Sequence, residues 1–358
     1  MFPVNGAHRV ASALALRLPT MPVQIVASKA LRMWNFNFFT SRGFEEKYAD
    51  FAMLQWTLHY VSNVSTVMFW PEAAADEEKM KQARVIVQRD CGGILYEKTI
   101  KVSRHGLASM ALHTYGIKEW LSIKITRLQT IFSGSDDDMR SISVFFIRPI
   151  STAHLITCKP NLRSLFALAD PKSSVHIPDY HDEVVLVAEM VLNPNSVMFL
   201  NRHVGDNCRE VASEVATRLE VPPVNPASFV LPQDIMVDSG AVMSFFGLRK
   251  RTDVDLLFQG NVTVSVLGDQ RGIHVEEHAF EHNRRVATGR PWGAEHLAEC
   301  TVDDLFTDPQ YYGYCHGIKY VSLTQLIRYK QRRGEPNKDD IDVSSLKRFI
   351  VGAVTGTA

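Results

Sequence analysis

The chain has no excess of either charge, because its 39 Lys and Arg residues are balanced by 39 Asp and Glu residues among 358. A protein without net charge has no overall field that draws it onto nucleic acid or an anionic membrane, so any such contact has to be local. Nucleic acid is therefore not an expected partner of the chain as a whole. Its composition, 46% hydrophobic and 22% charged, is that of a globular protein.

The sequence also lacks a hydrophobic run long enough to cross a membrane. Its most apolar stretch, residues 184–192, is interrupted by Glu189. A membrane-spanning helix needs about 20 consecutive apolar residues. We therefore expect no membrane span.

Cysteine is scarce, odd in number and never arranged as a CxxC pair. This pattern argues against a zinc ribbon and against a disulfide framework. We expect reduced thiols that mainly serve packing. The five residues are Cys91, Cys158, Cys208, Cys300 and Cys315.

Acidic residues are absent from the first 44 positions, where five basic residues stand. Apolar residues between Val23 and Trp34 recur there at helical spacing. An acid-free, Arg-bearing, amphipathic start is typical of a mitochondrial transit segment, so a mitochondrial location is our first expectation. The alternative is a cytoplasmic protein whose basic arm, residues 1–44, docks on the protein itself or on a protein partner.

Helical and strand patterns alternate along the first half of the chain. Apolar residues at spacings of three and four predict a helix over residues 44–64, and a second helix covers 77–89. β-branched and aromatic residues predict strands over 94–102 and 141–150. The fold class is therefore α/β (α+β), and residues 45–220 form an α/β domain of unknown function.

Residues 173–201 combine ligand-type side chains with a helix start. We predict a short strand, a helix with Asp179 as its N-cap, and an extended segment over 196–200. The clustered side chains could hold Zn²⁺ or supply a catalytic base. The acidic ones are equally explained by the first turn of a helix, which favours negative charge. The cluster is His176, Asp179, His181, Asp182 and Glu183.

Four prolines fall within residues 221–234. Proline fixes the backbone in extended conformations and removes amide donors, so this stretch predicts a stiff linker. We place the domain boundary there. Residues 235–358 then form the second domain.

Asp253 and Asp255 stand two residues apart in a strand-like segment that follows the basic turn 249–251. The period of two places both aspartates on one face of the strand. Two carboxylates on one edge suit Mg²⁺, which is usually completed by substrate phosphates. In-line nucleotidyl transfer by two metal ions requires such an arrangement.

The segment 236–258 resembles the nucleotidyltransferase superfamily, whose fold is shared with DNA polymerase beta and with small bacterial nucleotidyltransferases. In that family a Gly-Ser turn precedes an Asp-x-Asp strand. Residues 317–342 are similar to the family's closing helix, with Lys330 and Arg333, followed by a Lys-Asp-x-x-Asp element. The upstream half is similar to a domain fused to nucleotidyltransferase-like domains in uncharacterised proteins of bacteria and giant viruses.

The resemblance implies a mixed-sheet domain that binds a nucleoside triphosphate with Mg²⁺ as cofactor. Asp253 and Asp255 would hold the metal and act in catalysis. A serine and a glycine of the turn, here Ser239 and Gly240, would contact the triphosphate. Lys330 and Arg333 would face the phosphates, which fixed cations bind well.

Two departures from the family pattern separate the functional hypotheses. The turn is Ser239-Gly240, the family's residues in reversed order, and no third carboxylate is evident, with Glu276 or Glu277 as the best candidate. The first hypothesis is a nucleotidyltransferase-like protein that binds Mg-nucleoside triphosphate. The alternative is a catalytically inactive accessory or scaffold subunit of a larger mitochondrial complex. A third, addition of nucleotides to an RNA end, fits the same fold.

Overall fold

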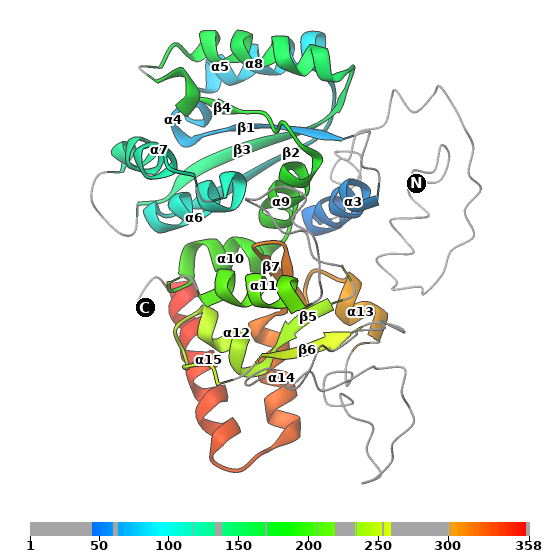
Figure 1. The fold of residues 1–358 in the computed structure, drawn as a ribbon, viewed down its shortest axis with the longest axis vertical. Coiled ribbons are helices and arrows are strands. Elements are labelled where there is room, and N and C mark those ends of the chain that lie inside the picture. The colour runs from blue at the N-terminus through cyan, green and yellow to red at the C-terminus, as the bar shows by residue number, and fades with distance from the viewer. Residues whose placement is uncertain are drawn as a thin grey trace, which may run out of the picture. The chain divides into compact units, whose positions relative to one another are not determined.

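The computed structural model divides into two compact units, each with its own sheet (Figure 1). Unit 1 holds the described residues up to 108 together with 119–192, and unit 2 holds 109–118 and the described residues from 193 onward. The division follows residue 192, ahead of the predicted linker. The structure describes residues 45–59, 64–116, 118–132, 138–168, 170–205, 207–218, 233, 235–252, 254–258, 300 and 302–355.

Unit 1 is built on a four-stranded antiparallel sheet with the order β2-β3-β1-β4. The strands predicted over 94–102 and 141–150 are confirmed as β2 and β3, because dense β-branched and aromatic residues fit a buried pleated surface. The strands are β1 Ser65–Phe69, β2 Gly92–Val102, β3 Arg140–Pro149 and β4 Val175–His176.

Helices pack on this sheet through a continuous apolar core. Phe69 of β1 lies 4.9 Å from Phe145 of β3 and 5.8 Å from Phe166 at the end of α8, measured between ring centroids. The helices of unit 1 and of the α6 segment are α3 Glu46–His59, α4 Pro71–Ala74, α5 Glu77–Ile86, η3 Val87–Cys91, α6 Arg104–Tyr115, α7 Leu121–Leu128, η4 Gln129–Ile131, α8 Thr152–Phe166, η5 Pro171–Ser173 and α9 His181–Val191.

The start of α9 differs from the prediction. The N-cap is Tyr180, which makes no side-chain cap bond, and Asp179 instead lies 3.2 Å from the ammonium of Lys159 on α8. The prediction of Asp179 as N-cap is therefore wrong. A long-range ion pair from a neighbouring helix takes this carboxylate, and no local pattern reports such a neighbour.

Residues 196–200 are helical, so the prediction of an extended segment there is wrong. They lie in α10, Pro194–Arg202, whose N-cap Asn193 accepts hydrogen bonds from the amides of Asn195 and Ser196. Proline at the first position of a helix lacks a donor that would be unsatisfied there in any case. The Asn-Pro pair thus starts a helix.

Four of the cysteines form disulfides, so the prediction of reduced thiols is wrong for them. Cys91 pairs with Cys158 across 67 residues, and Cys208 pairs with Cys315 across 107 residues. Neither pair is adjacent in sequence, so spacing carries no signal of it. The pairing follows from packing, which brings η3 against α8 and α11 against β7.

Unit 2 contains a mixed four-stranded sheet with the order β6-β5-β8-β7, as expected for the second domain. β5 is parallel to β8, and the other neighbouring pairs are antiparallel. The strands are β5 Ile235–Asp238, β6 Asp255–Phe258, β7 Tyr312–Cys315 and β8 Ile318–Val321. The helices are α10, α11 Asn207–Arg218, α12 Ser239–Phe245, α13 Val302–Thr307, α14 Leu323–Arg333 and α15 Lys338–Thr355.

No single described helix has the length and hydropathy to cross a membrane. Within the described part of the chain, one bent pair, α9 with α10, passes that test by length and composition when both helices are taken together. The α9 residues from Val184 to Val191 are all buried in the protein.

A buried and a half-buried histidine make the stability of unit 2 sensitive to acid. The His113 and His316 rings stack with centroids 3.8 Å apart, and His113 Nδ1 donates to the Ser109 carbonyl at 2.8 Å. Burial lowers the pKa of His113 to about 3, opposed by the Ser109 bond and aided by the nearby charge of His203. Burial also lowers the pKa of His316 well below its ordinary value.

As the pH falls below 6.5, His113 and His316 therefore bind protons in the unfolded chain but stay neutral in the folded unit. We expect the free energy of unfolding to be highest above pH 6.5 and to fall by about 1.4 kcal/mol per pH unit for each such histidine as the pH drops towards 3. Urea unfolding at pH 6.5 and 5.0 should show a smaller loss in His113→Phe than in the wild type, by about 2 kcal/mol. Equal losses would contradict this account.

Candidate functional site

The predicted turn lies where β5 ends and α12 begins. Asp238 is the last residue of β5, and Ser239 opens the helix with a φ of 54°. Residues other than glycine rarely adopt this left-handed backbone conformation, and holding one there costs about 1 to 3 kcal/mol of stability. The strain therefore falls at the Ser239-Gly240 turn that the sequence singles out.

The register of β5 and β6 places two carboxylates opposite each other. β6 runs antiparallel to β5, and Asp238 is the direct partner of Asp255. Residues paired in this way have Cβ atoms roughly 5 Å apart, and like charges directly opposite are destabilising. Asp238 is buried and Asp255 half-buried. Folding thus holds two acids together at the end of β5, beside the turn.

Tyr329 of α14 lies within electrostatic reach of both acids. The pKa of its phenol is raised to about 12, chiefly by burial and also by the charges of Asp238 and Asp255, against the lowering effect of Arg333. Arg333 Nη1 donates to the Tyr329 hydroxyl at 3.4 Å. This face of α14 therefore belongs to the same site as the two strands.

Gly240 is not required by the packing around it. A Cβ added at this position would meet no atom nearer than the guanidinium carbon of Arg249, at 4.0 Å. The fold therefore has room for a Cβ at this buried position. Arg249 is the cation that the structure places beside the turn, and it is half-buried.

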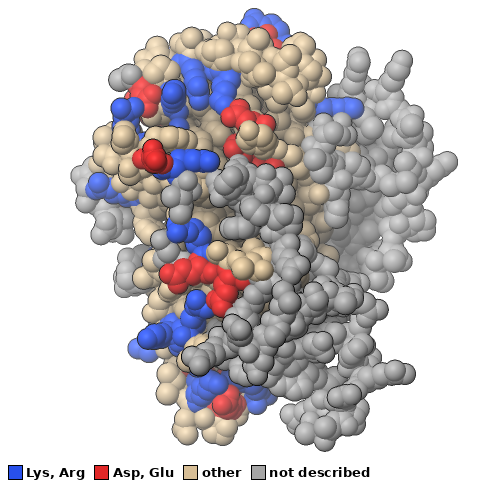
Figure 2. Space-filling model, in the orientation of Figure 1, with Lys and Arg blue, Asp and Glu red and all other residues tan. Residues whose placement is uncertain are grey.

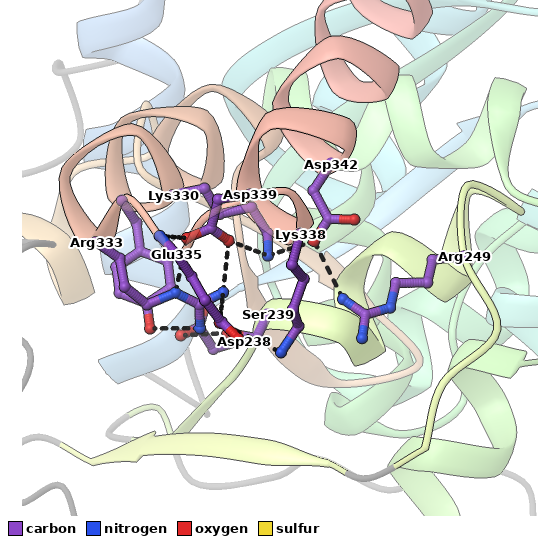
Figure 3. Close-up of polar contacts among 10 residues, drawn as sticks. Asp238, Ser239, Arg249, Lys330, Arg333, Glu335, Lys338, Asp339 and Asp342 are labelled. Atoms are coloured by element: carbon purple, nitrogen blue, oxygen red, sulfur yellow. Dashed lines mark hydrogen bonds and ion pairs between the residues drawn. The ribbon is translucent and has the colours of Figure 1, made fainter.

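Lys330 and Arg333 are held by carboxylates of α15 (Figure 3). Lys330 Nζ lies 2.7 Å from Asp342 and 3.5 Å from Asp339, and its side chain is only 1% exposed. Arg333 binds Asp339 through Nε and Nη2, at 2.9 and 2.5 Å. The Lys-Asp-x-x-Asp element therefore neutralises the cations of the preceding helix.

Arg249 joins this ion-paired group to the turn. Its Nη1 donates to Asp342 at 3.1 Å, so Asp342 accepts from both Arg249 and Lys330. Figure 3 draws Asp238 and Ser239 with these ion-paired residues. Residues more than 90 positions apart in the sequence thus converge on one site.

The structure brings together Ser239, Gly240, Asp255 and the cations Lys330 and Arg333 of the predicted site. Sequence reasoning missed Asp238, Arg249 and Tyr329. Asp238 directly precedes the turn, and this position in the sequence could have identified it as a site residue. The other predicted carboxylates, Asp253 and Glu276, lie outside the described residues, as does the basic segment 1–44.

The donor chemistry of the paired carboxylates suits a hard divalent cation such as Mg²⁺. Within the ranges that the structure describes, no group of three or more His, Cys, Asp or Glu side chains could hold a metal ion. The described part of the site therefore supplies two carboxylates, Asp238 and Asp255. A further ligand would have to come from water, substrate phosphate or Asp253.

The histidine-rich cluster at the start of α9 does not form a metal site. His176 Nε2 lies 3.4 Å from Glu183, and burial lowers the pKa of His176, which the Glu183 carboxylate opposes. Asp182 and Glu183 occupy the first turn of α9, where negative charge is favoured. The interpretation as a helix start is the one that these contacts support.

Comparison of the chain with protein-family models, with curated proteins and with solved structures finds no match. The function is therefore argued from the geometry of the site.

Proposed function

We propose that unit 2 is a nucleotidyltransferase-like domain that binds a nucleoside triphosphate together with Mg²⁺. The observation that supports this most is the pairing of Asp238 with Asp255 next to the strained Ser239-Gly240 turn. Two facing carboxylates and an unfavourable backbone conformation coincide at one place. Such features persist where function needs them, because they reduce stability.

The proposed roles follow from position. Asp255 and Asp238 bind the cation, with Asp253 completing the strand pattern. When bound, Mg²⁺ neutralises phosphate charge and orients an in-line displacement at phosphorus. Ser239 and the open backbone at Gly240 contact the triphosphate, and Arg249 and Arg333 add positive charge at its edge.

In this proposal Lys330 has a structural role and does not contact the nucleotide. Its ammonium is buried between Asp339 and Asp342, so it fixes α15 against α14 rather than reaching solvent. Arg333, whose side chain is 28% exposed, is the better placed of the two cations to meet phosphate.

Filling the space at Gly240 tests the proposal without removing a charge. We expect Gly240→Ala to keep the wild-type melting temperature, because an added Cβ meets no atom nearer than 4.0 Å and alanine is favoured over glycine inside a helix. The affinity for Mg-nucleoside triphosphate, measured by titration calorimetry, should fall at least about 10-fold, since a side chain would occupy the approach to the backbone.

Gly93→Ala is the matched control, because Gly93 in unit 1 also has open space around it, with no atom within 4 Å of an added Cβ. It should leave nucleotide affinity unchanged. Wild-type affinity in Gly240→Ala would argue that no ligand approaches the turn.

A second candidate function is supported by the neutralisation of Lys330 and Arg333. If these cations serve only to tie α14 to α15, the domain has kept its fold and lost its chemistry, and it acts as an accessory subunit of a larger assembly. Native mass spectrometry of the protein purified from its own cells would show a stable complex under this hypothesis. A monomer without partners would contradict it.

A further inference from the structure

The disulfide between Cys208 and Cys315 fastens helix α11 to the edge of the unit 2 sheet. Cys208 is the second residue of α11, and Cys315 is the last residue of β7, the outermost strand in the order β6-β5-β8-β7. Helix ends and the ends of edge strands are places where local opening begins. The bond thus closes a part of unit 2 that would otherwise open easily.

The noncovalent contacts of α11 are light. Arg251 donates to Glu214 at 3.0 Å and lies 3.9 Å from Glu210, at a surface where acidic and basic side chains are intermixed (Figure 2). Ion pairs as exposed as these contribute little to stability. The apolar side chains that α11 buries are small, and burial stabilises in proportion to apolar area. They are Val211, Ala212, Val215 and Ala216.

α11 in turn positions both parts of the nucleotide site proposed for unit 2. Asn207 Nδ2 donates at 3.0 Å to the carbonyl of Ser244 in α12, the helix that follows the strained turn. Glu214 holds Arg251, which stands four residues before Asp255 of β6. A displacement of α11 would therefore disturb the turn and the carboxylate strand together.

The disulfide of unit 1 is less accessible. Cys158 lies in the middle of α8 and Cys91 ends η3, and both are fully buried. Cys208 lies in the first turn of its helix, where helices fray. Thiol-disulfide exchange requires a thiolate to reach one of the two sulfurs, so access decides which bond is reduced first. We expect Cys208–Cys315 to be that bond.

We infer that the Cys208–Cys315 disulfide is a redox-sensitive switch, whose reduction by a dithiol releases α11 and loosens the nucleotide site. A thiolate of the dithiol attacks one sulfur and forms a mixed disulfide, which frees the other cysteine. The second thiol of the dithiol then displaces the remaining cysteine. The protein gains two electrons and two protons, and the dithiol is oxidised to its own disulfide.

Hydrogen exchange followed by mass spectrometry tests the release of α11 on the full chain. In the oxidised protein, alkylation in denaturant should modify Cys300 alone, the free cysteine of the structure. Dithiothreitol at a concentration that reduces Cys208–Cys315 and spares the disulfide of unit 1 should make the amides of α11 exchange at least about 10-fold faster. The amides of β6 should follow, and reoxidation should reverse both changes.

Cys208→Ala combined with Cys315→Ala should show the fast exchange without reductant. It should also bind Mg-nucleoside triphosphate at least about 10-fold more weakly than the oxidised wild type in titration calorimetry. The matched control is Cys91→Ala with Cys158→Ala, which removes the disulfide of unit 1 and should change neither measurement. Circular dichroism checks that the variants are folded, and the reduced wild type supplies the same comparison without a substitution.

The inference is overturned if α11 exchanges at the same rate in the oxidised and the reduced wild type. It is also overturned if Cys208 and Cys315 are alkylated before any reduction, or if nucleotide affinity is the same in both states. The effect on affinity rests on the function proposed for unit 2, whereas the exchange measurement does not. A wild type that binds no nucleotide in either state would contradict that function, and the exchange of α11 and β6 would then decide the inference alone.

Discussion

Asp255→Asn should abolish Mg²⁺-dependent turnover of nucleoside triphosphates while leaving unit 2 as stable as the wild type or slightly more so. The amide keeps the shape of the side chain and removes one of two like charges that face each other across β5 and β6. We expect turnover to fall at least about 100-fold, since a lost metal ligand removes several kcal/mol of stabilisation from the transition state. Asp238→Asn should behave in the same way.

Asp340→Asn is the matched control, because it removes an exposed carboxylate from the first turn of α15. It should change neither turnover nor the melting temperature by a large amount. Loss of activity together with retained or increased stability separates a functional carboxylate from a structural one. Turnover that survives in Asp255→Asn would remove the proposed metal site.

Lys330→Met should lower the free energy of unfolding by about 3 to 5 kcal/mol. The substitution leaves Asp339 and Asp342, whose side chains are 3% and 7% exposed, without the ammonium that lies between them. A buried carboxylate that loses its partner keeps its desolvation cost, and this loss exceeds what the pair contributes net. Urea unfolding measures the change.

Two further variants test whether the loss of stability in Lys330→Met comes from the buried ion pair. Arg332→Met, on the exposed side of the same helix, should stay within about 0.5 kcal/mol of the wild type. Lys330→Met combined with Asp342→Asn should recover part of the loss, since the uncompensated charge is removed. A loss below about 1 kcal/mol in Lys330→Met would contradict a structural role for this ion pair.

Local pattern was enough to predict much of the fold. Dense β-branched and aromatic residues located β3, and apolar residues at spacings of three and four located α3. The helix at 194–202 was missed because an Asn-Pro pair can either stop one helix or start another, and only packing decides. The disulfides depend on contacts between segments 67 and 107 residues apart, which no local rule reaches.

The site residues also fall into those that a local pattern reveals and those that depend on contacts between segments. Ser239, Gly240 and Asp255 lie within one short segment, so their pattern was visible in the sequence. Asp238 became significant only through strand register, which pairs it with Asp255. Register depends on hydrogen bonds between strands, and the sequence of one strand does not specify it.

For the helix of Lys330 and Arg333, the sequence indicates the residues but not their ion pairs. The sequence pattern identifies its two cations, whereas it does not show which carboxylates they pair with. α15 folds back so that Asp339 and Asp342 pair with the two cations, and Lys330 of this phosphate-type motif is buried while Arg333 stays partly exposed. Sequence spacing records which charges are available and not which of them pair.

The most direct test of the central claim is isothermal titration of the wild-type protein with each nucleoside triphosphate, with and without Mg²⁺. We expect saturable binding of one nucleoside triphosphate per chain that requires Mg²⁺ and is lost in Asp255→Asn. Absence of binding at millimolar ligand, or binding that ignores both Mg²⁺ and the Asp255 substitution, would contradict the claim that unit 2 is a nucleotide-binding domain.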